Sequence, residues 1–156
     1  LCHDIGDTLG VGSHMVELRR TKAGPFQEGD DFCTLQHLTD AYHYYTQNND
    51  ESRLRKLIHP IEFGIRHLPK IWVADTTVDS LCNGASLKVP GIAKVESDIQ
   101  VGEPVAVMTL KGELISVSES MMISKEMISK ERGIACRPQQ VFMRPGVYPK
   151  IEHKSK

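Results

Sequence analysis

Apolar residues at the start of the chain recur at helical spacing. Leu1, Ile5 and Leu9 lie four residues apart, which is typical of one helix face, and Gly10 follows where a left-handed C-cap is common. A second apolar stripe predicts a helix over 34–47. A helix that opens at Leu1 without a cap favours a chain that continues a longer protein.

Residues 14–21 alternate in polarity instead of repeating at helical spacing, and this alternation predicts a strand. A short helix is expected over 51–58, because Pro60 follows and the residue before a proline avoids helical geometry. The His-Leu-Pro segment at 67–69 is the expected domain boundary.

The second half of the chain is rich in short strands and glycine turns. Asp75 or Thr76 is expected to cap a helix that runs to about Asn83. The pair Lys111-Gly112 predicts a two-residue loop with glycine at positive φ. The expected strands are 70–73, 105–110, 114–117, 133–136 and 141–143. This pattern predicts a small β-barrel with one helix, so the fold class is α+β.

Composition excludes several classes of protein. Of 156 residues, 40% are hydrophobic and 25% charged, so the chain is not disordered throughout. The net charge of -1 excludes a polybasic nucleic-acid binder but leaves open a shaped local RNA site. No apolar run is long enough to span a membrane, and no signal peptide is seen. Four cysteines without a C-x-x-C pair predict no metal site and an intracellular protein with reduced thiols.

Two stretches, in this order, resemble one family. Residues 1–21 contain Leu-Cys-His-Asp-Ile-Gly, Leu-Gly-Val-Gly-Ser-His-Met and Glu-Leu-Arg-Arg-Thr, similar to the end of the catalytic domain of the TruB/dyskerin pseudouridine synthases. Residues 78–92, Val-Asp-Ser-Leu-Cys-Asn-Gly-Ala-Ser-Leu-Lys-Val-Pro-Gly-Ile, resemble the core signature of a PUA domain. Residues 110–115 and 145–149 fit the same domain. The order of the two stretches resembles that of the archaeal dyskerin-type proteins.

The resemblance implies an α+β protein. Residues 1–68 would be the C-terminal part of a mixed α/β catalytic domain, 69–150 a PUA β-barrel and 151–156 a basic tail. The chain would belong to an RNA-guided (box H/ACA) pseudouridine synthase acting on uridine in rRNA, with tRNA as a second substrate class. Its implied partners are H/ACA guide RNA, rRNA or tRNA and other H/ACA ribonucleoprotein subunits, in an archaeal cytoplasm, with no membrane, cofactor or metal. The alternative is a stand-alone PUA module that binds RNA without catalysis.

The chain departs from the family pattern at the catalytic motif. None of its aspartates lies in the Gly-Thr-Leu-Asp-Pro-type context of the family, and the family's Arg-Thr would precede Leu1. We therefore expect no catalytic residue here and no pseudouridine formation by this chain alone. Ser118 and Ser120 replace a glycine and an alanine of the PUA pattern, which puts a close backbone approach at position 118 in question.

By the resemblance, Leu18, Arg19 and Arg20 line the active site. Leu18 would line the pocket for the flipped base, although a plain core leucine on a strand fits the sequence equally well. The two arginines alternate along the expected strand. One would therefore face the pocket and the RNA backbone, and the other would face solvent.

The candidate RNA-binding residues come from the PUA signature and from the end of the chain. They are Gly84, Ala85, Leu87, Lys88, Val89, Pro90 and Gly91, then Arg144, Tyr148 and Lys150. Small residues allow RNA to approach the backbone, and Lys88 can meet a phosphate. Glycines that only make barrel turns are the alternative, and for Gly91 taken singly the structural role is favoured.

Overall fold

The computed structural model describes residues 1–29 and 32–150. The chain divides into two compact units, Leu1–Ile58 and His59–Lys156. We call them the N-terminal unit and the barrel unit. The expected basic tail, 151–156, lies outside the described residues.

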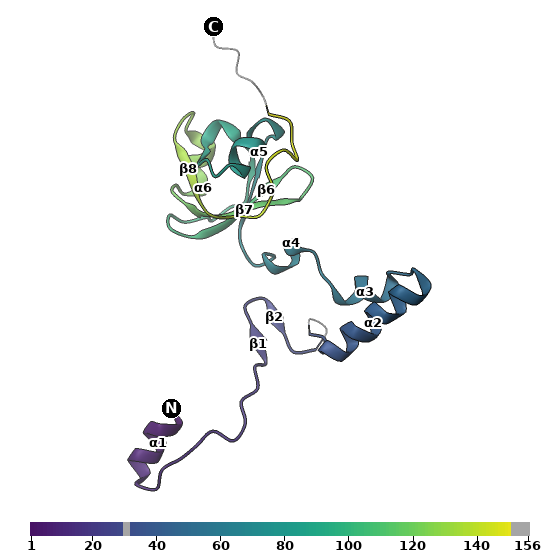
Figure 1. Ribbon diagram of the computed structural model, residues 1–156. Helices are drawn as coiled ribbons and strands as arrows, with labels where there is room; N and C mark the ends of the chain where they lie inside the picture. Colours follow the sequence, from purple (N-terminus) through teal and green to yellow (C-terminus); the bar gives the residue numbers. More distant parts are fainter. Residues whose placement is uncertain (30–31, 151–156) are drawn as a thin grey trace. The chain divides into compact units, whose positions relative to one another are not determined.

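The N-terminal unit is mainly helical. Its elements are α1 (Cys2–Leu9), β1 (Lys22–Ala23), β2 (Phe26–Gln27), α2 (Leu35–Asn48) and α3 (Ser52–Leu57) (Figure 1). Gly10 ends α1 in the left-handed conformation, with φ of 69°. The Thr34 hydroxyl caps α2 by accepting a hydrogen bond from the His37 amide at 3.2 Å. The predicted helices in this half are therefore confirmed.

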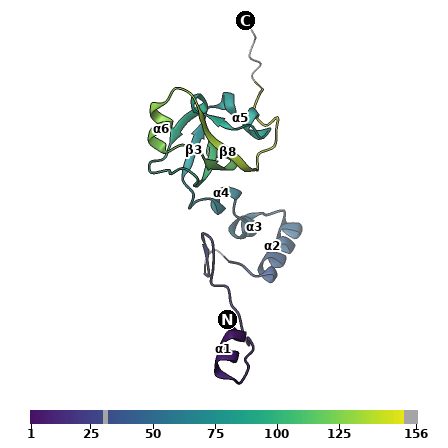
Figure 2. The ribbon, with the colours of Figure 1, turned by 90° about the vertical axis from the view of Figure 1, so that its left-hand side faces the viewer.

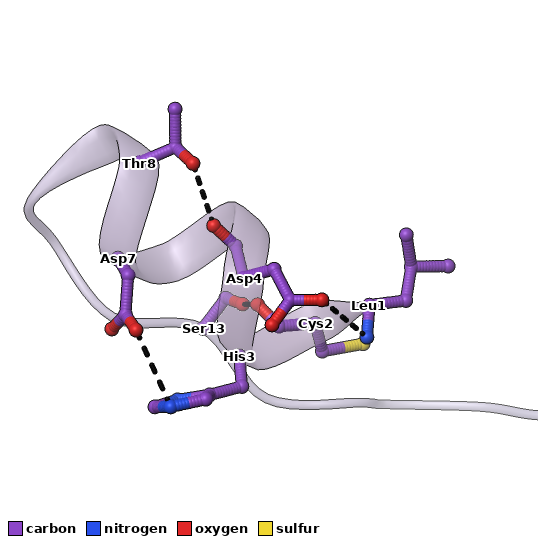
Figure 3. Close-up of polar contacts among 7 residues, drawn as sticks. All are labelled: Leu1, Cys2, His3, Asp4, Asp7, Thr8 and Ser13. Atoms are coloured by element: carbon purple, nitrogen blue, oxygen red, sulfur yellow. Dashed lines mark hydrogen bonds and ion pairs between the residues drawn. The ribbon is translucent and has the colours of Figure 1, made fainter.

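The chain leaving α1 turns back over the helix at Gly6. A side chain there would overlap the backbone of Gly12 and Ser13, so the close approach requires glycine. The Ser13 hydroxyl donates a hydrogen bond to the Cys2 carbonyl, and His3 lies 3.3 Å from the Asp7 carboxylate (Figure 3). The Ser13 contact holds the returning chain against the start of α1, the His3 contact lies within the helix, and the apolar stripe of the helix stays exposed.

The strand expected over 14–21 is absent, so that prediction was wrong. Residues 12–21 have no regular secondary structure, and the chain forms only the short hairpin of β1 and β2. A strand needs a neighbour for its backbone hydrogen bonds, and no described strand pairs with this stretch. Its apolar residues are exposed, and Leu18 is 80% exposed.

The barrel unit has a six-stranded sheet with the order β4-β8-β7-β6-β3-β5. Its strands are β3 (Lys70–Val73), β4 (Leu87–Lys88), β5 (Ile92–Val95), β6 (Pro104–Thr109), β7 (Leu114–Ser120) and β8 (Ile134–Val141). Neighbouring strands are antiparallel except for the parallel pair β3 and β6. The other elements are α4 (Ile61–Gly64), α5 (Asp75–Cys82), the 3₁₀ turn η1 (Val89–Gly91) and α6 (Ser124–Ser129).

The sheet is strongly curled and does not lie flat (Figure 2). The edge strands β4 and β5 are consecutive in the sequence, and only η1 separates them. A sheet whose edges are joined by three residues must wrap around its own core. Helix α5 packs on β7 and β8, and α6 packs near β5. The predicted small β-barrel and the α+β class are confirmed.

Three local predictions in the barrel need correction. The expected strands 133–136 and 141–143 form one strand, β8, in which Pro138 is opposite Ser118 at an irregularity where its missing N–H is tolerated. The loop between β6 and β7 is longer than two residues, because the Thr109 amide donates to the Glu113 carbonyl at 2.9 Å. Gly112 in that loop has the expected positive φ, 86°. Ala74 caps α5 without a side-chain bond, in place of Asp75 or Thr76.

The barrel has two apolar clusters. The larger cluster fills the interior and includes Ile71, Val78, Leu87, Ile115 and Tyr148. The smaller cluster combines Ile65 with Ala106, Met108 and Leu114, and Leu68 and Trp72 pack against it. Such burial is the dominant stabilising contribution to a small domain.

The segment before β3 packs with the barrel unit. Glu62 of α4 accepts a hydrogen bond from the Leu114 amide at 3.0 Å, and Ile65 is buried in the smaller cluster. Residues 59–68, which the sequence resemblance assigns to the first domain, thus belong to the second compact unit.

Candidate nucleic-acid interface

An open groove of about 540 Å³ runs between α5 and the segment that follows it. One wall is the face of α5 that carries Thr76, Thr77 and Ser80, and the other includes Ala85, Ser86, Lys88, Pro90 and Gly91. Four residues predicted from the PUA signature, Ala85, Lys88, Pro90 and Gly91, therefore line a common groove, whereas Gly84, Leu87 and Val89 are not among its lining residues.

Gly84 ends α5 with its backbone open to solvent. It has φ of 84°, a conformation that residues with a side chain rarely adopt. Its amide donates to the Leu81 carbonyl at 2.9 Å, and the Ala85 amide donates to the Ser80 carbonyl at 3.1 Å. No atom lies within 4 Å of the position that a Cβ would occupy. A ligand can therefore approach the backbone closely at this position.

Gly91 has a different role, which is to bring η1 against α5. A Cβ on Gly91 would lie 2.8 Å from Thr77 side-chain atoms, closer than atoms can pack. The Ala74 amide donates to the Gly91 carbonyl at 3.0 Å, which fixes the turn to the start of the helix. Gly91 thus sets the separation of the two groove walls.

Leu87 and Val89 hold the groove wall in place from inside. Their side chains lie in the larger core cluster, and Leu87 is only 1% exposed. The Val89 amide donates to the Gly133 carbonyl at 3.0 Å. Lys88, between them, is exposed on the groove side and has no ion pair with any described residue. Its ammonium group is therefore available to an anion.

Tyr148 is a core residue, not a free stacking surface. Its hydroxyl donates to Glu113 Oε2 at 2.6 Å, and Lys111 Nζ lies 5.1 Å from its ring centroid. The Glu113 carboxylate accepts hydrogen bonds from Tyr148, which has the largest effect, and from Thr109. Together with the positive charge of Lys111, these bonds hold the pKa of Glu113 below its ordinary value. Arg144 and Lys150 are exposed on either side of this anchor.

Arg19 and Arg20 line a separate groove of about 420 Å³ in the N-terminal unit. Glu28, Phe32 and His37 are among its other lining residues, and Arg19 forms an ion pair with Glu28. The strand that would make the two arginines alternate is absent, and both line this groove, so their place in an active site stays a prediction. Leu18 does not line this groove.

The serines that depart from the PUA pattern are interior residues. Ser118 and Ser120 are buried in β7, where Ser116 and Ser118 share a hydrogen bond at 3.0 Å and Ser120 donates to the Met122 carbonyl at 2.7 Å. Their hydroxyl groups are satisfied inside the barrel. They therefore do not form part of the groove surface.

The cysteine and histidine side chains of the described residues are scattered along the chain. Across 1–29 and 32–150, no cluster of His, Cys, Asp and Glu is suited to hold a metal ion. Cys82 and Cys136 are buried, and burial raises the pKa of the Cys136 thiol to about 12. Within the part of the chain that the structure describes, no helix combines the length and apolarity that crossing a membrane would require.

Comparison with protein families divides the chain in the same order as the sequence motifs. The profile of the tRNA pseudouridylate synthase B C-terminal domain matches residues 1–66, and that of the PUA domain matches residues 69–142. The chain belongs to the TruB/dyskerin family.

Relatives in this family align along nearly the whole chain. The probable tRNA pseudouridine synthase B of Methanopyrus kandleri is 48% identical over 150 residues, covering 96% of this chain and 44% of that protein. The protein of the same description from Pyrococcus abyssi is 47% identical, covering 97% and 45%. The chain thus spans less than half the length of these curated relatives.

Solved structures agree with this assignment. The archaeal box H/ACA sRNP Nop10–Cbf5 complex contains a chain that matches with a TM-score of 0.84 and 47% identity, over 96% of this chain and 48% of that one. The Cbf5–Nop10–Gar1 complex matches with a TM-score of 0.81 and 47% identity, over 96% and 45%. An H/ACA RNP bound to a substrate RNA matches with a TM-score of 0.82 and 47% identity, over 95% and 47%.

Sequence reasoning missed the α5 wall of the PUA groove. Thr76 and Ser80 are four residues apart and Thr77 is adjacent, so a helix over 75–82 places all three near one face. That spacing could have indicated a hydroxyl-bearing face. Its position against η1 depends on Gly91, which only the three-dimensional structure shows.

Proposed function

We propose that the chain supplies the PUA RNA-binding domain of an RNA-guided, box H/ACA pseudouridine synthase that isomerises uridine in rRNA, with tRNA as a second substrate class. The related proteins carry the description tRNA pseudouridine synthase B, and one solved relative is an H/ACA RNP bound to substrate RNA. The alternative, a stand-alone PUA module, has the same RNA-binding groove but no catalytic partner.

One observation carries this proposal: an open groove that combines hydroxyl groups with a single unpaired lysine and adjoins the accessible backbone of Gly84. Sequence-selective proteins read single-stranded RNA through hydrogen bonds to exposed base edges. Phosphate contacts position the strand without reading its sequence. The groove has hydroxyl groups that can bind base edges and one lysine that can bind a phosphate, so it suits a short unpaired RNA element such as an ACA end.

The experiment is a titration of the chain with ACA-ended and scrambled single-stranded RNA at several salt concentrations. We expect tighter binding of the ACA-ended RNA and a shallow salt slope, about one to three released counterions. Lys88→Ala should weaken both RNAs alike and reduce the slope by roughly one unit. Gly84→Val should lower selectivity by blocking the close approach, provided that circular dichroism shows an intact barrel.

Lys125 provides the matched control, because it is exposed on α6 and lies outside the groove. Lys125→Ala should leave affinity, selectivity and salt slope unchanged. Equal binding of both RNAs, with a steep slope that neither Lys88→Ala nor Gly84→Val alters, would contradict the assignment of the site.

Catalysis requires residues that this chain does not contain. The family's catalytic aspartate lies in a motif that is absent from the sequence, and loss of a nucleophile removes most of an enzyme's acceleration. We expect no tritium release from labelled substrate RNA, with or without guide RNA. Turnover clearly above a blank without protein would contradict this expectation.

The partners follow from the same proposal. Two solved relatives are complexes of Cbf5 with Nop10, one of them with Gar1, so we place this protein in an H/ACA ribonucleoprotein within the cytoplasm. Leu18, Arg19 and Arg20 would then line the active site together with residues that this chain lacks. Arg144, Tyr148 and Lys150 would form a second RNA-facing group, with Tyr148 as its anchor to the barrel.

A further inference from the structure

We propose that Thr76 and Ser86 are the specificity-determining hydroxyl groups of the PUA groove, one on each wall, and that each reads a base edge of the bound RNA. This inference rests on the proposed function, because it assigns the reading of sequence within that groove. Thr76 lies outside the PUA stretch at 78–92, and Ser86 lies within it but is not among the RNA-binding residues expected from the sequence.

The hydroxyl groups that line the groove differ in whether they already have a hydrogen-bond partner in the protein. Ser80 donates its proton to the Thr77 carbonyl at 2.8 Å, so its hydroxyl is already engaged. The Thr77 side chain is packed against Gly91. Thr76 and Ser86 have no side-chain hydrogen bond to any described residue, although both line the groove. They are therefore the two hydroxyl groups of the groove that have no hydrogen bond to a described residue and do not pack against Gly91.

Thr76 and Ser86 lie on opposite walls of the groove. Thr76 is exposed on the second residue of α5, and Ser86 is half-buried between the end of α5 and β4. Gly91 holds η1 against Thr77, so the separation of the two walls is fixed by packing. A base inserted between the walls would meet one hydroxyl on each side.

Hydroxyl groups have the hydrogen-bonding chemistry that reading a base edge requires. A hydroxyl group can donate one hydrogen bond and accept two, so it can pair with either kind of polar group on a base edge. A site built to hydrogen-bond a ligand rejects the analogue that leaves its polar groups unpaired. Lys88, the charged residue of the groove, contacts RNA as a point charge and cannot supply this discrimination.

The test measures the affinity of the full chain for an ACA-ended RNA and for RNAs in which one of the three bases is changed. Thr76→Val and Ser86→Ala should each reduce discrimination by about three- to tenfold, since a hydrogen bond contributes about 1 kcal/mol. We expect the loss at one base position for each variant. Thr76→Ser should restore discrimination, because it keeps the hydroxyl.

Ser97 is the matched control, since it is exposed outside the groove and no described residue bonds its hydroxyl. Ser97→Ala should leave discrimination unchanged, and Lys88→Ala should lower affinity for every RNA equally. If Thr76→Val and Ser86→Ala keep full discrimination while the unaltered chain prefers ACA, the inference fails and the proposed function stands. If the unaltered chain shows no preference, both fail.

Discussion

The two compact units of this chain use their apolar residues in opposite ways. In the barrel unit, side chains from all parts of the sheet meet in two buried clusters. In the helices of the N-terminal unit, Gly6 and Ala41 are the buried residues, whereas Leu35 is 84% exposed. Both units have recognisable helices or strands, so secondary structure alone does not distinguish them.

Only the barrel unit buries enough apolar surface to be stable by itself. Burial of apolar surface must offset the conformational entropy lost on folding. The hairpin of β1 and β2 pairs only two residues on each strand, and an isolated hairpin of this kind is marginal in water. The N-terminal unit therefore needs further protein surface to become stable, while the barrel unit does not.

The largest expected effect is the behaviour of the two units as separate fragments. Residues 59–150 should unfold in one cooperative transition close to that of the barrel in the full chain, because both clusters remain complete. Residues 1–58 should show no cooperative transition in thermal melts followed by circular dichroism. A cooperative melt of a monomeric 1–58 fragment would contradict the claim that the N-terminal unit is unstable by itself.

Single apolar substitutions in the two units should have different effects on the free energy of unfolding. Ile115→Ala, in the larger cluster, is expected to lower the free energy of unfolding of the barrel by about 2–5 kcal/mol, because it leaves a cavity. Leu35→Ala, on an exposed face, should change it by less than about 0.5 kcal/mol. Urea titration of the full chain measures both values. Similar losses for the two variants would mean that the N-terminal unit contributes to the same cooperative core.

The segment 59–68 decides where the boundary between the two units lies. A fragment that starts at residue 69 lacks Ile65, Leu68 and the bond from Glu62 to the Leu114 amide. We expect it to be about 2–4 kcal/mol less stable than 59–150, from the lost burial and the unpaired amide. Equal stability of the two fragments by urea titration would place this segment outside the barrel unit.

A smaller effect is expected at the Tyr148 anchor. Tyr148→Phe removes the hydrogen bond that contributes most to the lowered pKa of Glu113. A lowered pKa in the folded state stabilises the fold above the ordinary value of 4.5 and loses this effect as pH falls through the folded value. The variant should thus melt below the unaltered chain at neutral pH, with a difference that shrinks in acid.

Thermal melts of both proteins between neutral and acidic pH check this sign. Tyr42→Phe is the control, because Tyr42 is an exposed residue of α2. It should leave the barrel transition unchanged at every pH. A difference between Tyr148→Phe and the unaltered chain that grows in acid would contradict the assigned direction.

Local patterns predicted much of the barrel. Glycine turns, short strands and the PUA signature are encoded by neighbouring residues, and β3, β6 and β7 follow them, whereas β4 and β5 were not predicted. The predicted strand over 14–21 failed because alternation describes a strand only where a partner strand exists. Polarity along a sequence does not reveal that partner.

Contacts between distant residues account for the other differences. The Glu62 bond joins residues 52 positions apart, and Tyr148 meets Glu113 across 35 positions. No local pattern signals either contact. The PUA signature located one wall of the groove, but the hydroxyl groups on α5 became candidates only when Gly91 was seen to pack against Thr77.

Hydrogen exchange of the full chain, with and without ACA-ended RNA, compares the stability of the two units and locates the RNA-binding surface in one experiment. Amides of residues 69–143 in the strands should exchange slowly, whereas those of 1–58 should exchange rapidly through local opening. Added RNA should increase protection within 75–91 and leave 1–58 unchanged. Equal protection of both units, or RNA-dependent protection confined to the N-terminal unit, would contradict the account of a self-sufficient barrel that binds RNA in the α5 groove.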